Sequence, residues 1–183
     1  MSPLQRQVAA IRLGRHLISS AVFRRARRVA VYWPTAGEID LTPVIHRCWQ
    51  MGKWVFLPVL ATPPGKRMEF GRYTRSSRLV VNRYGIPEPA QPPGDRLRAA
   101  QLDIILMPLV AMDSAGNRVG MGAGYYDRTL ENVADSALSP TLIGVGYQFQ
   151  QVRKIESQPW DIRLDWLVTD QALSRVRPVQ PGC

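Results

Sequence analysis

The sequence predicts one α/β domain over residues 1–183, a three-layer α/β/α sandwich with a mostly parallel central sheet. Two patterns predict this fold. Short β-branched and apolar segments alternate with segments of helical periodicity, and such strand–helix–strand units pair their strands in parallel. The apolar run at 102–113 shows no in–out alternation, as expected of a central strand covered on both faces. A chain of 183 residues, 45% hydrophobic and 21% charged, is long enough to bury one core.

The chain begins with a predicted helix and a predicted strand. Apolar residues at near-helical spacing predict a helix from Pro3 to about Phe23, and Ser2 followed by Pro3 is a favourable helix start. The run VAVYW at 29–33 is β-branched and aromatic and ends at a proline, so we expect a buried strand there.

A second helix and strand follow the loop TAGEIDL. In TPVIHRCWQMG, Thr42 is the predicted N-cap, Pro43 the first helical residue and Gly52 the C-terminal glycine. The segment KWVFLPVL at 53–60 is the next predicted strand. Together with strand 29–33 it forms a parallel pair with a right-handed crossover.

The middle of the chain, 61–100, is rich in proline and has room only for short strands. These are RMEFGRY at 67–73 and RLVVN at 78–82. The segment YGIPEPAQPPGD at 84–95 is predicted to be a loop, and its length marks it as functional or mobile.

The last third of the chain returns to alternating elements. After the central strand at 102–113, we expect a helix at 125–135 and strands at 141–147 and 164–170. No internal repeat or domain boundary is visible. The order of elements predicts a Rossmann-like arrangement, in which ligands bind beyond the carboxyl ends of the strands.

The net charge of +10 favours anionic ligands. Part of it lies in FRRARRVAVYW, where Arg24, Arg25, Arg27 and Arg28 are close together. Such a cluster is compatible with nucleic-acid binding, but no nucleic-acid-binding motif accompanies it. We therefore expect a solvated helix end that leads into a buried strand, and no nucleic-acid partner.

Cysteine content and hydropathy bear on the compartment. Cys48 and Cys183 form neither a disulfide framework nor a metal-binding pattern, which suits a reducing compartment. No apolar run approaches the roughly 20 residues of a spanning helix. The start, MSPLQRQVAAIRLGRHL, is charged throughout and lacks the core of a signal peptide. We expect a cytoplasmic protein without membrane association.

The segment GNRVGMGAGYYDR, from Gly116 to Arg128, is the strongest functional signal. It follows the predicted central strand and precedes a helix, where backbone N–H groups bind phosphate oxygens well. Glycines allow close approach to the backbone, and the guanidinium of Arg118 suits phosphate. The segment is neither a P-loop nor a dinucleotide-binding fingerprint, since it lacks the Gly-Lys-Ser/Thr ending and the spacing of the third glycine. On residues alone, Asp127 is best interpreted as an acid in the first turn of a helix.

The longer string LVAMDSAGNRVGMGAGYYDRTL closely resembles the 5-formyltetrahydrofolate cyclo-ligase family, whose hallmark is a Leu-Gly-x-Gly-x-Gly-Tyr/Phe-Tyr-Asp segment. The resemblance covers most of the chain. VAVYWPTAGEIDLTPVI, GKWVFLPVL, YGIPEP, LDIILMPLVAMD and QPWDIRLDWLVTD all occur in the order and spacing of the family.

The resemblance implies an activity. The family converts 5-formyltetrahydrofolate to 5,10-methenyltetrahydrofolate and hydrolyses ATP to ADP and phosphate, with Mg²⁺. By this resemblance Arg118 acts on the transferring phosphoryl group, and the ATP-binding residues are Arg118, Val119, Gly120, Met121, Gly122, Ala123, Gly124, Tyr125 and Tyr126. Asp127 and Asp161 would hold Mg²⁺, because hard oxygen ligands suit a hard cation.

The resemblance also implies a folate site. Glu38 matches a glutamate that binds the pterin, whose amide and amino donors suit a carboxylate, and Glu38 and Arg118 are the expected catalytic residues. Trp33 corresponds to a position on the substrate wall, and Tyr84 to an aromatic that stacks on the pterin. Met121, Gly122, Ala123, Gly124 and Tyr125 would face the folate as well.

The sequence departs from the family pattern at its start. Family members carry a Lys-x-x-x-Arg pair on a first helix that contacts ATP, whereas MSPLQRQVAAIRLGRHL resembles the segment after that pair. Two hypotheses follow: the true start lies upstream, or this is a folate-binding, catalytically impaired paralogue. The expected partners are ATP and 5-formyltetrahydrofolate, with or without a polyglutamate tail, and the expected state is a monomer.

Overall fold

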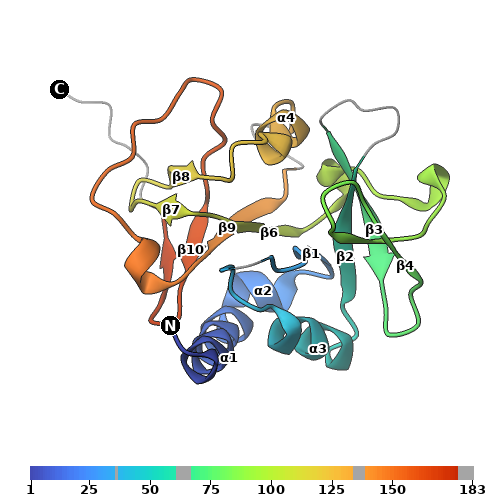
Figure 1. Cartoon of the computed structure of the whole chain (residues 1–183), viewed down its shortest axis with the longest axis horizontal. Helices are drawn as coiled ribbons and strands as arrows, with labels where there is room; N and C mark the ends of the chain where they lie inside the picture. The colour runs from blue at the N-terminus through green and yellow to red at the C-terminus, as the bar shows by residue number, and fades with distance from the viewer. Residues whose placement is uncertain (36, 61–66, 134–138, 177–183) are drawn as a thin grey trace.

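The structure is a computed structural model that describes residues 1–35, 37–60, 67–133 and 139–176 (Figure 1). A central sheet has the strand order β11-β10-β9-β6-β1-β2-β3. Strands β10, β9, β6, β1 and β2 are parallel to their neighbours in this set, and the edge strands β11 and β3 are antiparallel. The sheet is therefore mostly parallel, as the sequence predicted.

The strands of this sheet are short. Their bounds are β1 Arg28–Ala30, β2 Trp54–Leu60, β3 Met68–Tyr73, β6 Ile104–Pro108, β9 Thr141–Val145, β10 Trp166–Val168 and β11 Leu173–Arg175. The predicted strand at 29–33 is shorter than expected and starts one residue earlier. The predicted central strand at 102–113 was too long: β6 ends at Pro108, and the chain then turns into a separate short strand.

The first predicted helix is two helices. Helix α1, Pro3–Ser19, begins at Ser2, whose side chain accepts from the backbone N–H of Gln5 while the Gln5 side chain accepts from the backbone N–H of Ser2. Ser20 has extended backbone angles and caps α2, Ala21–Arg25, through its hydroxyl. Serine is favoured at a cap because its side-chain oxygen accepts from free backbone N–H groups. Ser20 therefore caps α2 instead of continuing α1, and α1 ends before Phe23.

Helix α3, Thr42–Gln50, connects β1 to the parallel strand β2. The prediction that Thr42 is the N-cap was wrong by one residue, because Leu41 occupies that position. The Thr42 N–H and hydroxyl both donate to Asp40 Oδ1, at 2.8 and 2.7 Å. Gly52 has φ +69°, so the predicted glycine after the helix is present.

The core lies on both faces of the sheet. Figure 1 shows α1, α2 and α3 on one face and α4, Tyr125–Leu130, on the other. Along β6, Ile104 and Leu106 belong to the buried cluster under α1 and α3, while Ile105 and Met107 belong to the cluster under α4. This is the burial on both faces that the apolar run predicted. The α4 layer is thinner, since α4 has six residues and irregular segments cover the rest.

Four features were missed in the proline-rich middle and the second half, one of them the edge strand β11, which follows the predicted last strand at 164–170. The predicted loop at 84–95 contains β5, Pro87–Pro89, which pairs with β4, Leu79–Val81, in a separate hairpin. A second hairpin joins β7, Ala111–Met112, to β8, Arg118–Val119. The chain also has 3₁₀ turns η1 Pro93–Asp95, η2 Ala99–Gln101 and η3 Gln148–Gln150. The predicted helix at 125–135 was too long: α4 ends at Leu130, residues 131–133 form a turn, and residues 134 and 135 lie outside the described residues.

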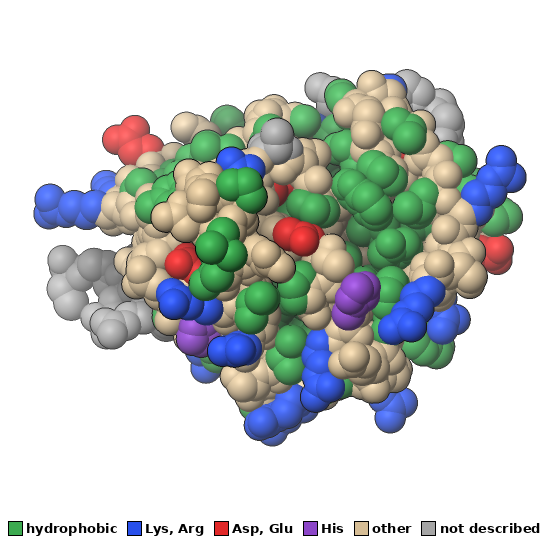
Figure 2. Space-filling view, turned by 60° about the horizontal axis from the view of Figure 1, so that its bottom comes forward, with side chains coloured by type: hydrophobic (Ala, Val, Ile, Leu, Met, Phe, Trp, Pro, Cys, Tyr) green, Lys and Arg blue, Asp and Glu red, His purple; other side chains and the backbone are tan. Residues whose placement is uncertain are grey.

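The arginine-rich segment is a solvated helix end, as expected. Arg24, Arg25 and Arg27 are exposed, and β1 follows directly. The buried Lys53 Nζ donates to the backbone carbonyls of Arg24 and Ala26, the latter at short range, and thereby caps α2. On the face seen in Figure 2, most Lys and Arg side chains lie over the lower part and at the two sides.

Two further predictions concern the thiols and the membrane. Cys48 is buried in α3, and burial raises the pKa of its thiol to about 12. Cys183 lies outside the described residues. No helix in the described part of the chain is long and apolar enough to span a bilayer.

Candidate active site

A cavity of about 1000 Å³ opens at the carboxyl ends of β1, β2 and β6. This is the position that the fold class predicts for a ligand. Its lining includes every residue that the sequence assigned to the site: Trp33, Glu38, Tyr84, Arg118, Val119, Gly120, Met121, Gly122, Ala123, Gly124, Tyr125, Tyr126, Asp127 and Asp161. Segments far apart in the sequence therefore meet around one space.

Arg118 and Asp127 form an ion pair in the cavity wall. Arg118 Nη2 lies 2.6 Å from Asp127 Oδ1, and the two side chains are 6% and 21% exposed. Asp127 Oδ1 also accepts from the backbone N–H of Ile162 at 3.2 Å. The carboxylate expected to bind Mg²⁺ thus contacts the guanidinium expected to bind phosphate.

The position of Arg118 depends on a buried aspartate that the sequence reasoning took only for the end of a strand. Asp113 is 2% exposed and accepts hydrogen bonds from Ala115 N, Asn117 N, Asn117 Nδ2 and Ile155 N. Burial raises the pKa of Asp113, but these hydrogen bonds, that of Asn117 first, outweigh it and the net pKa is lowered. Asp113 therefore fixes the turn between β7 and β8, and β8 carries Arg118.

The glycine segment 120–124 connects β8 to α4. Gly122 and Gly124 have φ values of +83° and +62°, which other residues adopt at a cost. Gly120 has no such requirement, and a Cβ there would lie 3.4 Å from Arg118 Nη1. The position that a side chain would occupy at Gly120 faces the guanidinium, so glycine keeps that part of the cavity wall open. Met121 is 74% exposed.

Two buried polar atoms in the cavity wall lack partners. Within the described residues, Thr35 Oγ1 and Arg118 Nε are the buried side-chain nitrogen or oxygen atoms without a hydrogen bond, and both residues line the cavity. Buried polar groups in native proteins are nearly always paired. The cavity wall therefore carries hydrogen-bonding capacity that the described residues do not use among themselves.

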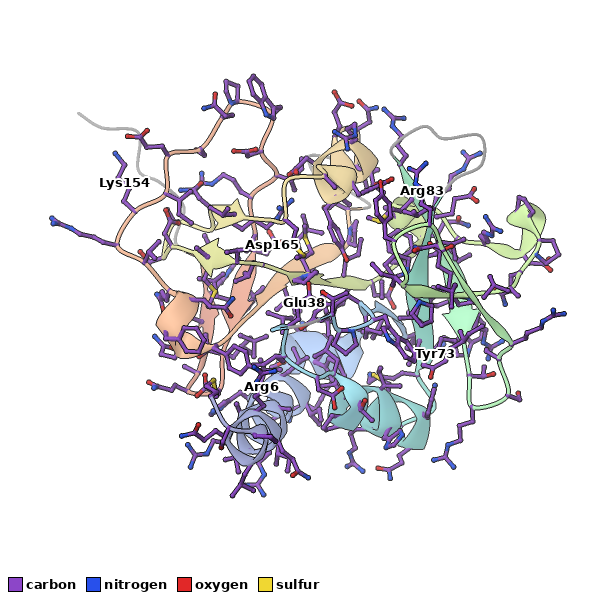
Figure 3. All side chains as sticks on the ribbon, viewed as in Figure 1. Arg6, Glu38, Tyr73, Arg83, Lys154 and Asp165 are labelled. Carbon is purple, nitrogen blue, oxygen red and sulfur yellow. The ribbon has the colours of Figure 1, made fainter. Side chains whose placement is uncertain are left out.

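Glu38 lies on the loop after β1, near the middle of the molecule (Figure 3). Its Oε2 accepts from the backbone N–H of Thr35 at 2.8 Å, and its own N–H donates to the Thr35 carbonyl. Close by, burial raises the pKa of Tyr32 and Tyr126, and the charge of Glu38 adds to both shifts. Both phenols are therefore neutral donors at physiological pH.

Two tyrosines meet at the rim of the cavity. Tyr84 Oη lies 3.1 Å from Tyr125 Oη, and the ring centroids are 6.1 Å apart in an edge-to-face arrangement. Arg83 Nη2, on the β4–β5 side of the molecule in Figure 3, donates to Tyr125 Oη at 2.6 Å. Hydrogen bonds from Tyr84 and Arg83 lower the pKa of Tyr125. Tyr84 is 56% exposed, so its ring is accessible for stacking.

The carboxylates of the cavity suit magnesium only with added ligands. Asp127 and Asp161 both line the cavity, but no cluster of three acidic, His or Cys side chains forms a metal site within the described ranges. Asp161 Oδ2 already accepts from Gln158 N at 2.8 Å. Mg²⁺ commonly binds through one or two carboxylates together with substrate phosphates and water. The donor set fits that mode and does not form a complete cage.

The comparisons with known proteins decide the family. A family model described as the 5-formyltetrahydrofolate cyclo-ligase family matches residues 1–170. The chain belongs to this family. It is therefore related to enzymes of the ligase class, and the resemblance seen in the sequence is confirmed.

Individual relatives agree with this assignment. The 5-formyltetrahydrofolate cyclo-ligase of Escherichia coli K12 is 37% identical over 169 residues, which are 92% of this chain and 92% of the relative. That of Haemophilus influenzae is 36% identical over 164 residues, 90% of this chain and 87% of the relative. The NMR structure of Aquifex aeolicus 5,10-methenyltetrahydrofolate synthetase has a TM-score of 0.83 at 32% identity, covering 100% of this chain and 89% of that chain.

For this member of the cyclo-ligase family, sequence reasoning missed part of the cavity wall. The additional lining residues include Asn82, Glu88, Arg128, Glu131 and Glu156. Asn82 and Glu88 lie on the β4–β5 hairpin, which was predicted as a strand followed by a loop. One signal was present: Glu88 is an acid between two prolines in IPEP, an unusual place for a charged residue that proves to be buried.

Proposed function

We propose that this protein catalyses the ATP- and Mg²⁺-dependent cyclisation of 5-formyltetrahydrofolate to 5,10-methenyltetrahydrofolate, with release of ADP and phosphate. Family membership supports the reaction class. The observation that carries the proposal for this chain concerns Arg118. Its buried Nε has no hydrogen-bond partner, and Arg118 lines the same cavity as the glycine segment. A phosphoryl group would pair with this guanidinium once it turns from Asp127.

The chemistry requires activation of a formamide oxygen. That oxygen attacks the γ-phosphorus of ATP, so an O–P bond forms and the bond from the γ-phosphorus to the bridging oxygen breaks, releasing ADP. The second folate nitrogen then attacks the activated carbon, loses its proton, and the C–O bond breaks to expel phosphate. In-line positioning and compensation of the moving negative charge are the main tasks of the protein.

The residues divide into two groups in this proposal. Arg118 and the backbone of 119–126 hold the phosphates, with Arg118 on the transferring group. On the folate side, the carboxylate of Glu38 accepts from the pterin donors, Tyr84 stacks on the ring, and Trp33 forms the wall. The segment 121–125 lies between the two groups and would contact both substrates.

Asp127 and Asp161 are the proposed magnesium ligands. Bound Mg²⁺ would neutralise charge on the ATP phosphates. For Asp127 to serve, its 2.6 Å contact with Arg118 has to be exchanged for the metal while Arg118 turns to phosphate. ATP and Mg²⁺ together can replace both partners of this ion pair, which makes the exchange electrostatically balanced.

The assay uses purified protein, 5-formyltetrahydrofolate, ATP and MgCl₂, with absorbance of the methenyl product as the readout. We expect product only when all three are present, and one ADP per product. The absence of product from a folded preparation would sink the proposal. Folate binding without conversion would favour the impaired paralogue instead.

The proposal includes a cytoplasmic location and a monomeric state. Light scattering during size exclusion tests the second, with a mass near the 20.6 kDa of one chain expected. Cell fractionation tests the first.

A further inference from the structure

Glu88 is a buried carboxylate in the cavity wall. It lies in the middle of β5, is 7% exposed, and none of the ion pairs within the described residues involves it. An unpaired buried charge is costly unless hydrogen bonds compensate it. The other buried charged side chains have their roles in the fold, since Lys53 caps α2 and Asp113 fixes the β7–β8 turn. Neither of these roles explains why Glu88 is buried.

The hydrogen bonds of Glu88 connect two parts of the cavity wall. Its Oε1 accepts from the backbone N–H of Leu60, the last residue of β2, at 3.0 Å. The same oxygen accepts from Asn82 Nδ2 at 2.7 Å. Glu88 thus attaches the β4–β5 hairpin to the carboxyl end of a central strand.

Asn82 passes this restraint to the turn of the hairpin. Its Oδ1 accepts from the backbone N–H groups of Tyr84 and Ile86, at 2.9 and 3.1 Å, and its own N–H donates to the Ile86 carbonyl at 2.9 Å. Gly85 completes the turn with φ +77°. The side chain of Asn82 is therefore the centre about which residues 82–86 fold, as in other asparagine-based turns.

The turn determines where Tyr84 lies. Its hydroxyl is 3.1 Å from that of Tyr125, the first residue of α4. Hydrogen bonds thus link β2 through Glu88 and Asn82 to the backbone of Tyr84, whose hydroxyl contacts Tyr125 of α4 across the rim.

We propose that Glu88, acting through Asn82, is a positioning residue that holds Tyr84 against the folate side of the cavity. The inference rests on the proposed function, since it takes Tyr84 to contact the folate. Oε1 alone makes the two hydrogen bonds, so the role requires an acceptor at this position and not a negative charge. Direct recognition of the substrate by the carboxylate would require the charge.

Two substitutions separate these roles. Glu88→Gln keeps the acceptor and removes the charge, so we expect the Kd for 5-formyltetrahydrofolate to stay within about threefold of wild type. Glu88→Ala removes the acceptor and should raise that Kd about tenfold or more, with the KM for ATP within about twofold. Loss of a single well-placed hydrogen bond of the chain commonly produces an effect of this size.

Asn82→Ala is the second variant, and it keeps the test decisive where Glu88→Ala fails to fold. It should raise the folate Kd to the same extent. In the Tyr84→Ala background, neither Asn82→Ala nor Glu88→Ala should weaken folate binding further, because positioning acts only through Tyr84. Thermal unfolding of each variant confirms that it is folded.

The measurements distinguish a positioning role from direct recognition of the substrate and from a general structural role. A Glu88→Gln protein as weak as Glu88→Ala overturns the inference in favour of direct recognition, and additive losses in the Tyr84→Ala background overturn it in favour of a general structural role. Folate affinity is measured by quenching of protein fluorescence without ATP, so it does not depend on turnover. A wild-type protein that binds folate but forms no product contradicts the proposed function alone.

Discussion

Replacing Arg118 by methionine tests the ion pair at the centre of the site. Arg118→Met keeps the length of the side chain and removes its charge and donors. In the native protein the Arg118 side chain is 6% exposed, and its Nη2 lies 2.6 Å from Oδ1 of Asp127, whose side chain is 21% exposed. The substitution therefore leaves a largely buried carboxylate without its main partner.

The magnitude follows from burial. Removing one partner of a fully buried ion pair costs about 3–5 kcal/mol. Asp127 keeps its hydrogen bond from Ile162 and is one-fifth exposed to water, so we expect a loss of about 2–3 kcal/mol in the free energy of unfolding. For a domain of this size that lowers Tm by about 4–12 °C. Loss of the phosphate donor should lower kcat about 10²- to 10³-fold.

Urea unfolding followed by circular dichroism measures the first effect, and the methenyl assay measures the second. Arg67→Met is the matched control, because Arg67 pairs with Glu131 at 3.3 Å with both side chains about 60% exposed. An exposed pair contributes about 0–1 kcal/mol, so this variant should unfold and turn over nearly as wild type does. Equal stability and activity of the two variants would refute the account of Arg118.

Three further predictions concern the glycine segment, the β7–β8 turn and the buried thiol. Gly122→Ala should lose about 1–2 kcal/mol of stability because of its positive φ, as measured by urea titration, whereas Gly120→Ala should unfold as wild type but raise the KM for ATP about tenfold. An unchanged KM for ATP in Gly120→Ala would show that the glycines only form turns. Asp113→Ala should cost about 3 kcal/mol or more, since it leaves backbone N–H groups unpaired. Because the pKa of Asp113 is lowered on folding, its contribution to the free energy of unfolding is present above the ordinary aspartate pKa of about 3.9. That contribution is lost as pH falls through the lower folded value. A stability difference between wild type and Asp113→Ala that does not shrink in acid would contradict this. Cys48, with a pKa raised to about 12, should resist alkylation at pH 8 in the native protein and react in urea, as measured by mass spectrometry; rapid native labelling would contradict its burial.

The sequence predicted the parallel core well because strands buried on both faces are continuous apolar runs. The apolar runs predicted as strands at 53–60, 102–113 and 141–147 contain β2, β6 and β9 of the central sheet. Boundaries were less accurate where a side chain competes with the backbone. Ser20 ended α1 by capping α2, and Asp40 occupied the donors of Thr42 at the start of α3.

The β4–β5 hairpin was the main element that could not be predicted from the sequence. Pro87 and Pro89 remove backbone donors and argue against a strand. They are tolerated because β5 pairs only with β4, in a two-stranded sheet apart from the central one. The hairpin depends on the contacts of Asn82 and Glu88, which are set by three-dimensional packing and not by local propensity.

Every predicted site residue lines one cavity, but the sequence could not show which of them contact each other. Arg118 and Asp127 are nine positions apart, and the sequence assigned them to phosphate and metal separately. The turn built on Asp113 and the closed contact of Arg118 with Asp127 depend on the β7–β8 hairpin, two strands of two residues each. Elements this short leave almost no periodic signal in a sequence.

In the proposed reaction, this cavity transfers the γ-phosphoryl group of ATP to the formyl oxygen of the folate. The most direct test is to label that oxygen with ¹⁸O, run the reaction in unlabelled water, and examine the inorganic phosphate by mass spectrometry. We expect one ¹⁸O atom in the phosphate for each methenyl product formed. Label that appears in water, with unlabelled phosphate, would contradict it.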